Sequence, residues 1–125
     1  MAAALMTTHE AIAAELDLGP DDELLDVGCG SATLFVDPAR QVRYVAGLDA
    51  SPLQLELARK RLAERLAAGT AEIVEGDAGH LPWDDDRFSV ATSINALKFF
   101  PDPLAALREM QRVLRPGGRM AVTLG

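Results

Sequence analysis

Three sets of residues in this chain of 125 residues carry groups that could hold a ligand. Gly28 and Gly30 flank Cys29 directly after an apolar run, and glycines at this spacing let the backbone turn sharply with no side chain above it. A flat ligand could therefore approach the main chain itself. Asp49 and Asp77 each end a later β-like run, and a carboxylate accepts hydrogen bonds from a diol or an amine. Each set alone also fits a tight turn, a helix cap or a loop.

Short strands that alternate with helices are expected to position these residues. We expect strands over 24–27, 43–49, 71–76, 88–93 and 119–124. Capping signals predict helices that begin after Thr7, Ser51 and Asp102. The apolar spacing predicts that these helices bury Ala11, Ile12 and Leu16, then Leu55, Ala58, Leu62 and Leu66, then Leu104, Leu107, Met110 and Leu114.

Alternation of strands and helices predicts a mainly parallel sheet, in which ligands bind beyond the carboxyl ends of the strands. Gly28, Asp49 and Asp77 all fall at such ends. Asp49 is placed to accept from a ribose diol, and Asp77 from an exocyclic amine such as that of adenine, with the main chain of Ala78 bonding the ring. The helix after the glycine bend should be short, because Pro38 interrupts it.

Composition limits the classes of function. The length predicts one domain over residues 1–125, and the formal net charge of −7 disfavours nucleic-acid or anionic-membrane partners. The single cysteine excludes an internal disulfide, and with no apolar leader or spanning run the expected location is cytoplasmic. Acids at 84–86 and bases at 59–65 are interpreted as solvated faces, not as metal or nucleic-acid sites.

Five motifs in order resemble those of class I S-adenosylmethionine-dependent methyltransferases, closest to the small-molecule subgroup that includes ubiquinone and menaquinone biosynthesis enzymes. The resemblance runs from about Leu24 to Leu124. The motifs are Asp26-Val27-Gly28-Cys29-Gly30, Gly47-Leu48-Asp49-Ala50-Ser51, Gly76-Asp77-Ala78, Leu81-Pro82-Trp83 through Phe88, and Leu114-Arg115-Pro116-Gly117-Gly118.

The resemblance implies S-adenosylmethionine as cofactor and in-line methyl transfer to a small molecule. It implies that Gly28 and Gly30 line the methionine part and ribose, that Asp49 binds the ribose hydroxyls, and that Asp77 holds the adenine amine. The further residues that it implies at the cofactor are Asp26, which organises the loop or meets the methionine amine through water, Cys29 within the glycine motif, Ala50 and Leu81 near the adenine, Ala78 through its backbone, and Asn95 facing the methyl group. No catalytic base is assigned, and His80 lies in a loop where the family varies.

The family fold implied is a Rossmann-like α/β domain, doubly wound, with about five strands in the order 3-2-1-4-5 and helices on both faces. Besides the helix that Pro38 interrupts, two departures from the family pattern stand out. Ala32 occupies the place of a third glycine, so its methyl group is expected to crowd the cofactor's amino-acid tail. The sequence ends after the fifth strand, so the family's usual last two strands have no counterpart, and a homodimer or another partner is expected to cover strand five.

Two other functions stay open at this point. A nicotinamide-dependent oxidoreductase would share the glycine bend and Asp49, but Thr33 stands at the third glycine of Gly-x-Gly-x-x-Gly and no Tyr-x-x-x-Lys pair is present. A non-catalytic, methyltransferase-like assembly module would instead pair through its fifth strand.

Overall fold

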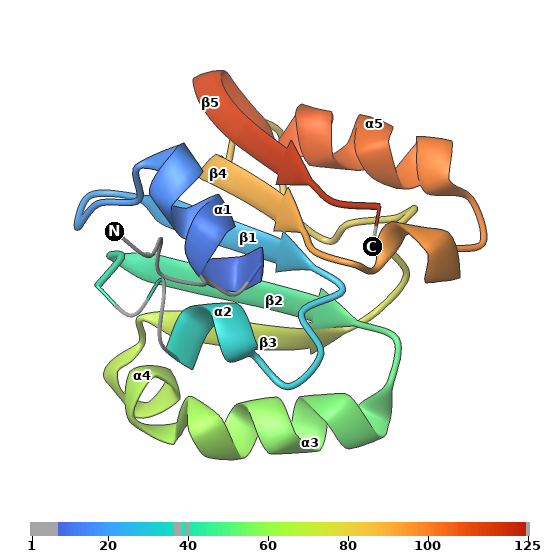
Figure 1. Ribbon diagram of the computed structural model, residues 1–125. Coiled ribbons are helices and arrows are strands. Elements are labelled where there is room, and N and C mark those ends of the chain that lie inside the picture. The colour runs from blue at the N-terminus through green and yellow to red at the C-terminus, as the bar shows by residue number, and fades with distance from the viewer. Residues whose placement is uncertain (1–7, 37–38, 40, 125) are drawn as a thin grey trace, which may run out of the picture.

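A five-stranded sheet forms the centre of the computed structural model, which describes residues 8–36, 39 and 41–124. The strands lie in the order β3-β2-β1-β4-β5, and every neighbouring pair is parallel, as the arrowheads in Figure 1 show. The elements along the chain are α1 (Thr8–Leu16), β1 (Glu23–Val27), α2 (Thr33–Val36), β2 (Tyr44–Asp49), α3 (Pro52–Arg61), α4 (Ala63–Ala68), β3 (Ala71–Glu75), β4 (Phe88–Ser93), the 3₁₀ helix η1 (Leu97–Phe99), α5 (Pro103–Val113) and β5 (Leu114–Val122).

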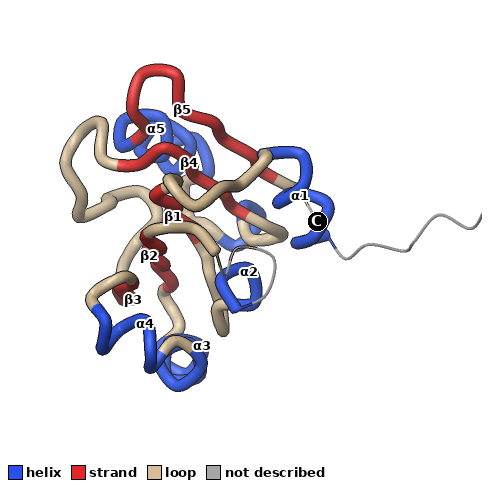
Figure 2. The backbone as a smooth tube through the Cα atoms, turned by 90° about the vertical axis from the view of Figure 1, so that its left-hand side faces the viewer, coloured by secondary structure: helices blue, strands red, loops and turns tan. Residues whose placement is uncertain are grey.

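Helices cover both faces of this sheet, and two apolar clusters result. Side chains of α1, α2 and α3 pack on one face, where Leu24 of β1 is fully buried. Side chains of α5 pack on the other face, where Leu25 is fully buried, so β1 is covered on both sides. Figure 2 shows the layers from the side, with α2 and α5 on opposite sides of the sheet. The predicted fold class and strand order are confirmed.

The sequence places most elements correctly but misjudges some buried faces. In α5 the buried stripe is Ala106, Met110 and Val113, whereas Leu104 is 55% exposed. Leu104 and Ala106 are two residues apart, about 200° around a helix, so they face opposite sides. The prediction for Leu104 is therefore wrong, as is that for Ala11 in α1, which is exposed. Thr7, the expected cap of α1, lies outside the described residues.

Two boundaries also differ from expectation. The single helix expected from Ser51 to Gly69 is divided at Leu62 into α3 and α4, and Gly69 ends the second at φ +76°. Strand β5 begins at Leu114, five residues before the expected start, because the turn sequence around Gly117 forms an irregularity within the strand. The helix α2 has four residues, so the predicted short helix is confirmed.

The amino ends of the strands hold a network of ion pairs. Glu23 accepts hydrogen bonds from Arg87 at 2.8 Å and from Arg115. Arg119 of β5 donates to Asp22 at 2.8 Å and to the carbonyl oxygen of Leu16 at 2.9 Å, and this ties β5 to the end of α1. None of the helices in the described part of the chain is long and apolar enough to cross a membrane.

Candidate functional site

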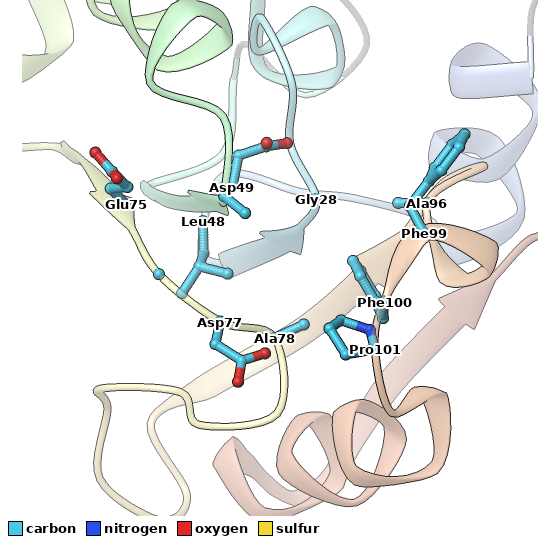
Figure 3. Close-up of a pocket in the computed structure, with 12 residues that line it drawn as sticks. Gly28, Leu48, Asp49, Glu75, Asp77, Ala78, Ala96, Phe99, Phe100 and Pro101 are labelled. Carbon is cyan, nitrogen blue, oxygen red and sulfur yellow. The ribbon is translucent and has the colours of Figure 1, made fainter.

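A cavity of about 450 Å³ lies at the carboxyl ends of β1, β2, β3 and β4, where parallel sheets commonly bind ligands. Figure 3 shows carboxylates on its β2–β3 side and aromatic rings on the side of the β4–α5 connection. Its lining residues are Gly28, Leu48, Asp49, Ala50, Glu75, Gly76, Asp77, Ala78, Ala96, Phe99, Phe100 and Pro101.

The glycine bend sits at the floor of this cavity and lacks room for side chains. Gly28 has φ +79°, and a Cβ built on it would lie 2.5 Å from the Cβ of Ala96. Its N–H donates to the carbonyl oxygen of Leu48 at 2.7 Å, and the N–H of Cys29 donates to the same oxygen at 3.1 Å. A glycine is therefore required at position 28 both by backbone conformation and by contact.

Asp49, the last residue of β2, fixes the shape of the bend. One carboxylate oxygen accepts the N–H of Gly30 at 2.8 Å, and the other accepts the N–H of Ser51 at 2.9 Å. The carboxylate thus joins the bend to the start of α3, where Ser51 is the N-cap. Each carboxylate oxygen can accept about two hydrogen bonds, so both keep capacity for the hydroxyls of a ligand.

Asp77 lines the cavity from the turn after β3, and its side chain is 54% exposed. Its carboxylate accepts the N–H of Gly79 at 2.9 Å and lies 3.1 Å from Nδ1 of His80. The Gly79 N–H, and then His80, hold the pKa of Asp77 below its usual value, so the carboxylate stays ionised. In Figure 3 the Asp49 and Asp77 carboxylates point away from each other.

Asp26 lies within the sheet below the bend and not at the cavity surface. It is 3% exposed, and one carboxylate oxygen accepts the hydroxyl proton of Thr92 at 2.8 Å. Burial raises the pKa of Asp26 to about 7, the Thr92 hydrogen bond opposes this shift, and the charge of Asp49 adds to it. A carboxyl with this pKa changes charge near neutral pH, directly beneath the site.

Five other residues singled out in the sequence lie outside the lining: Cys29, Gly30, Ala32, Leu81 and Asn95. Cys29 is buried against Gly47, and a Cβ built on Gly47 would lie 2.7 Å from the Sγ of Cys29. Burial raises the pKa of this thiol. Leu81 is 6% exposed within the core that α5 covers. The exposed Asn95 accepts the Thr123 hydroxyl at 2.9 Å. Ala32 is fully buried in the core, so the expectation that its methyl group crowds a ligand is wrong.

The sequence interpretation gave no role to seven of the lining residues. Ala96, Phe99, Phe100 and Pro101 form the apolar side, and Leu48, Glu75 and Gly76 join the side of the carboxylates. The sequence carried one signal for the apolar side, because Phe-Phe-Pro follows the end of β4, and its neighbour β1 contributes Gly28 to the site.

Comparison with known proteins gives a family and several relatives. Residues 25–122 match the family model described as "Methyltransferase domain". A sterol 4-C-methyltransferase of Caenorhabditis elegans is 33% identical over 119 residues, which are 95% of this chain and 36% of that protein. A 2-phytyl-1,4-naphtoquinone methyltransferase of Synechococcus elongatus is 39% identical over 106 residues, 82% of this chain and 46% of that protein.

A solved structure shares the fold. The SAM-dependent methyltransferase TM1293 of Thermotoga maritima superposes with a TM-score of 0.70 at 28% identity, over 91% of this chain and 49% of that one. The chain spans less than half the length of the two curated relatives named above.

Proposed function

Because this chain belongs to the methyltransferase domain family, we propose that its cavity binds S-adenosylmethionine and presents the methyl group to a small-molecule acceptor. When bound, the cofactor supplies an electrophilic methyl group on a sulfonium. The observation that carries the proposal is the contact of Asp49 with the glycine bend, 2.8 Å from carboxylate to Gly30 N–H. This contact places a carboxylate that can accept hydrogen bonds from a diol next to main chain that no side chain covers, within one cavity.

The residues of the cavity fit an adenosyl group. Asp49 would accept the ribose hydroxyls, and Gly28, which lines the cavity without a side chain, would let the ligand approach the main chain. Asp77 would accept from the adenine amine, with Ala50 and Ala78 beside the ring. We place Asp26, Cys29, Gly30, Leu81 and Asn95 in supporting positions around it, where they shape the loops that meet the ligand.

The apolar side of the cavity supports an apolar acceptor. Phe99 lines the cavity and is 76% exposed, so its ring is available to a further ligand. Two relatives are named for a sterol and a naphthoquinone, both largely apolar molecules. The titratable residues of the described lining, Asp49, Glu75 and Asp77, lie on the other side, so this chain would act by holding the acceptor in line with the methyl group.

We also propose that residues 1–125 form one cofactor-binding core domain in the cytoplasm, with no nucleic-acid or membrane partner. The single cysteine and the net charge of −7 support these assignments. A second role, assembly into a dimer, is supported by β5, which pairs with β4 alone among the described strands.

Calorimetry with S-adenosylhomocysteine tests the proposed cofactor. The chain should bind it, and Asp49→Ala should weaken binding by about tenfold or more, because hydrogen bonds to a charged group contribute about 1.5–3 kcal/mol. Asp84→Ala, in the exposed acidic loop, is the matched control and should bind normally. Absence of binding, or equal affinity in Asp49→Ala, would contradict the proposal.

A further inference from the structure

The turn from Asp77 to His80 places a histidine directly behind a carboxylate of the cavity. Gly79 and His80 each contact a different oxygen of Asp77, at 2.9 and 3.1 Å. Both contacts come from within the same turn, so they fix the rotamer of Asp77 without help from the rest of the fold. The orientation in which the Asp77 carboxylate faces a ligand therefore depends on its contact with His80.

His80 also faces charged groups on α5. Glu109 accepts the N–H of Leu81, next to His80, at 2.9 Å. The hydrogen bond from Arg112 is the main reason that the pKa of Glu109 is lowered, and the charge of His80 contributes to the same shift. Arg112 donates to both Glu109 oxygens, so this carboxylate is already paired. Asp77, Glu109 and Arg112 are therefore the charged groups around an imidazole whose side chain is 87% exposed.

Resting on the proposed function, we propose that His80 is a positioning residue that makes the binding of an adenosyl group by Asp77 depend on pH. As a neutral ring with a proton on Nδ1, His80 holds the rotamer of Asp77 and leaves the full negative charge for the amine of the ligand. As a cation, it neutralises much of that charge and weakens the carboxylate as an acceptor. Histidine is the side chain that ordinarily changes charge between pH 5 and 8.

The direction and size of the effect follow from the exposure of the pair. Affinity for an adenosyl ligand should rise with pH, because deprotonation of His80 restores the acceptor. The rise should be roughly two- to fivefold between pH 5.5 and 8, the range typical of exposed charge pairs.

The probe must be insensitive to the charge of Asp26, because burial raises the pKa of Asp26 to about 7. We therefore choose 5′-methylthioadenosine, which carries the adenosyl group but no ammonium or sulfonium and so has no charge to attract to Asp26. Its affinity is measured by calorimetry at pH 5.5, 6.5, 7.2 and 8 for the whole chain and each variant.

Three variants complete the test. His80→Asn keeps a neutral donor near the position of Nδ1, so it should match the wild type at pH 8 and lose the dependence on pH. His80→Ala releases Asp77 and should bind more weakly at pH 8, also without the dependence. His9→Asn replaces the other histidine, on α1, and should keep the wild-type pH profile. Thermal unfolding of each variant checks that it folds.

Two results would overturn the role of His80 while leaving the cofactor site in place. One is a wild-type affinity that does not change with pH, and the other is a His80→Asn profile that is as steep as the wild type. Failure of the wild type to bind 5′-methylthioadenosine and S-adenosylhomocysteine at every pH would instead overturn both this proposal and the proposed function.

Discussion

At the scale of single residues, the clearest conflict between stability and function is at Asp26. Its carboxyl is buried under the glycine bend with Thr92 as a hydrogen-bond partner, and burial raises its pKa to about 7. An ionised carboxylate in such a place destabilises the fold unless a positive charge approaches it. A sulfonium or ammonium group in the cavity above would supply that charge.

Asp26→Asn should therefore stabilise the protein in a pH-dependent way. The pKa of Asp26 in the folded protein, about 7, lies above its ordinary value of 3.8, so proton binding to this carboxyl favours the folded state. This contribution to stability is fully present below about pH 4 and is lost as the pH rises to about 7. The variant does not suffer this loss, so its free energy of unfolding should exceed that of the wild type by about 1–3 kcal/mol at pH 8.

Urea unfolding at pH 5 and pH 8 measures this difference. The gap between Asp26→Asn and the wild type should widen with pH, whereas Asp21→Asn, at an exposed acid nearby, should give a constant gap. A gap that narrows as pH rises would show that the raised pKa is wrong.

Gly28 and Gly30 offer a matched pair of substitutions. Both have positive φ, so alanine at either should cost about 1 kcal/mol in backbone strain. Only at position 28 would the new Cβ also collide with Ala96, at 2.5 Å, since at position 30 the nearest atom is 3.8 Å away. Calorimetry with S-adenosylhomocysteine should show no binding by Gly28→Ala and measurable binding by Gly30→Ala. Equal loss of binding in both variants would mean that backbone strain, and not the collision with Ala96, causes the loss.

Residue types at strand ends made part of the site predictable. Gly28, Asp49 and Asp77 could be placed because the end of a parallel strand is recognisable from the sequence and such ends meet at one edge. Phe99 and Phe100 were missed because they follow the strand by several residues, and the sequence does not show how the chain returns over the cavity. Ala32 was misjudged because the direction of a side chain depends on its φ, which is +71° here.

At the scale of elements, a few polar contacts, in addition to apolar packing, join the edge strand β5 to α1 and to the segment that follows it. Arg119 is the main example, because its guanidinium reaches both Asp22 and the last residue of α1. The sequence predicted β1, β2 and β3 well because each is a short, largely apolar run that ends at a glycine or an acid. It predicted the buried face of α5 poorly because several apolar stripes are present on that helix and only packing selects among them.

Arg119→Ala should lower the free energy of unfolding by about 1–2 kcal/mol, since it leaves the Asp22 carboxylate without its charged partner. Arg119→Lys should cost less, because lysine can pair with Asp22 but cannot also donate to Leu16 in the same fork. Urea unfolding of the two variants checks the order. A lysine variant as unstable as the alanine variant would assign the stabilisation to the Leu16 contact.

At the scale of the whole molecule, the amino ends and the carboxyl ends of the strands have different roles. The amino ends hold Asp22 and Glu23 in ion pairs, and the carboxyl ends hold the cavity. β5 is an edge strand of this sheet. Among the described residues, no strand pairs with its outer backbone groups. Such an edge favours pairing with another chain.

This chain should accordingly associate as its concentration rises. Light scattering should show a dimer that Met120→Lys weakens, because a charge on an edge strand opposes pairing. Leu53→Lys makes the same change at an exposed position of α3, away from β5, and should leave association unchanged. A monomer at all concentrations, or equal effects of both substitutions, would contradict pairing through β5.

The carbonyl oxygen of Leu48, which receives the N–H groups of Gly28 and Cys29, makes the binding loop an extension of the sheet's own hydrogen bonding. Because both hydrogen bonds end on β2, we expect this loop to open together with β2 and not by itself. On heating, we expect the capacity to bind nucleoside ligands to persist up to the cooperative loss of the whole fold and to vanish with it.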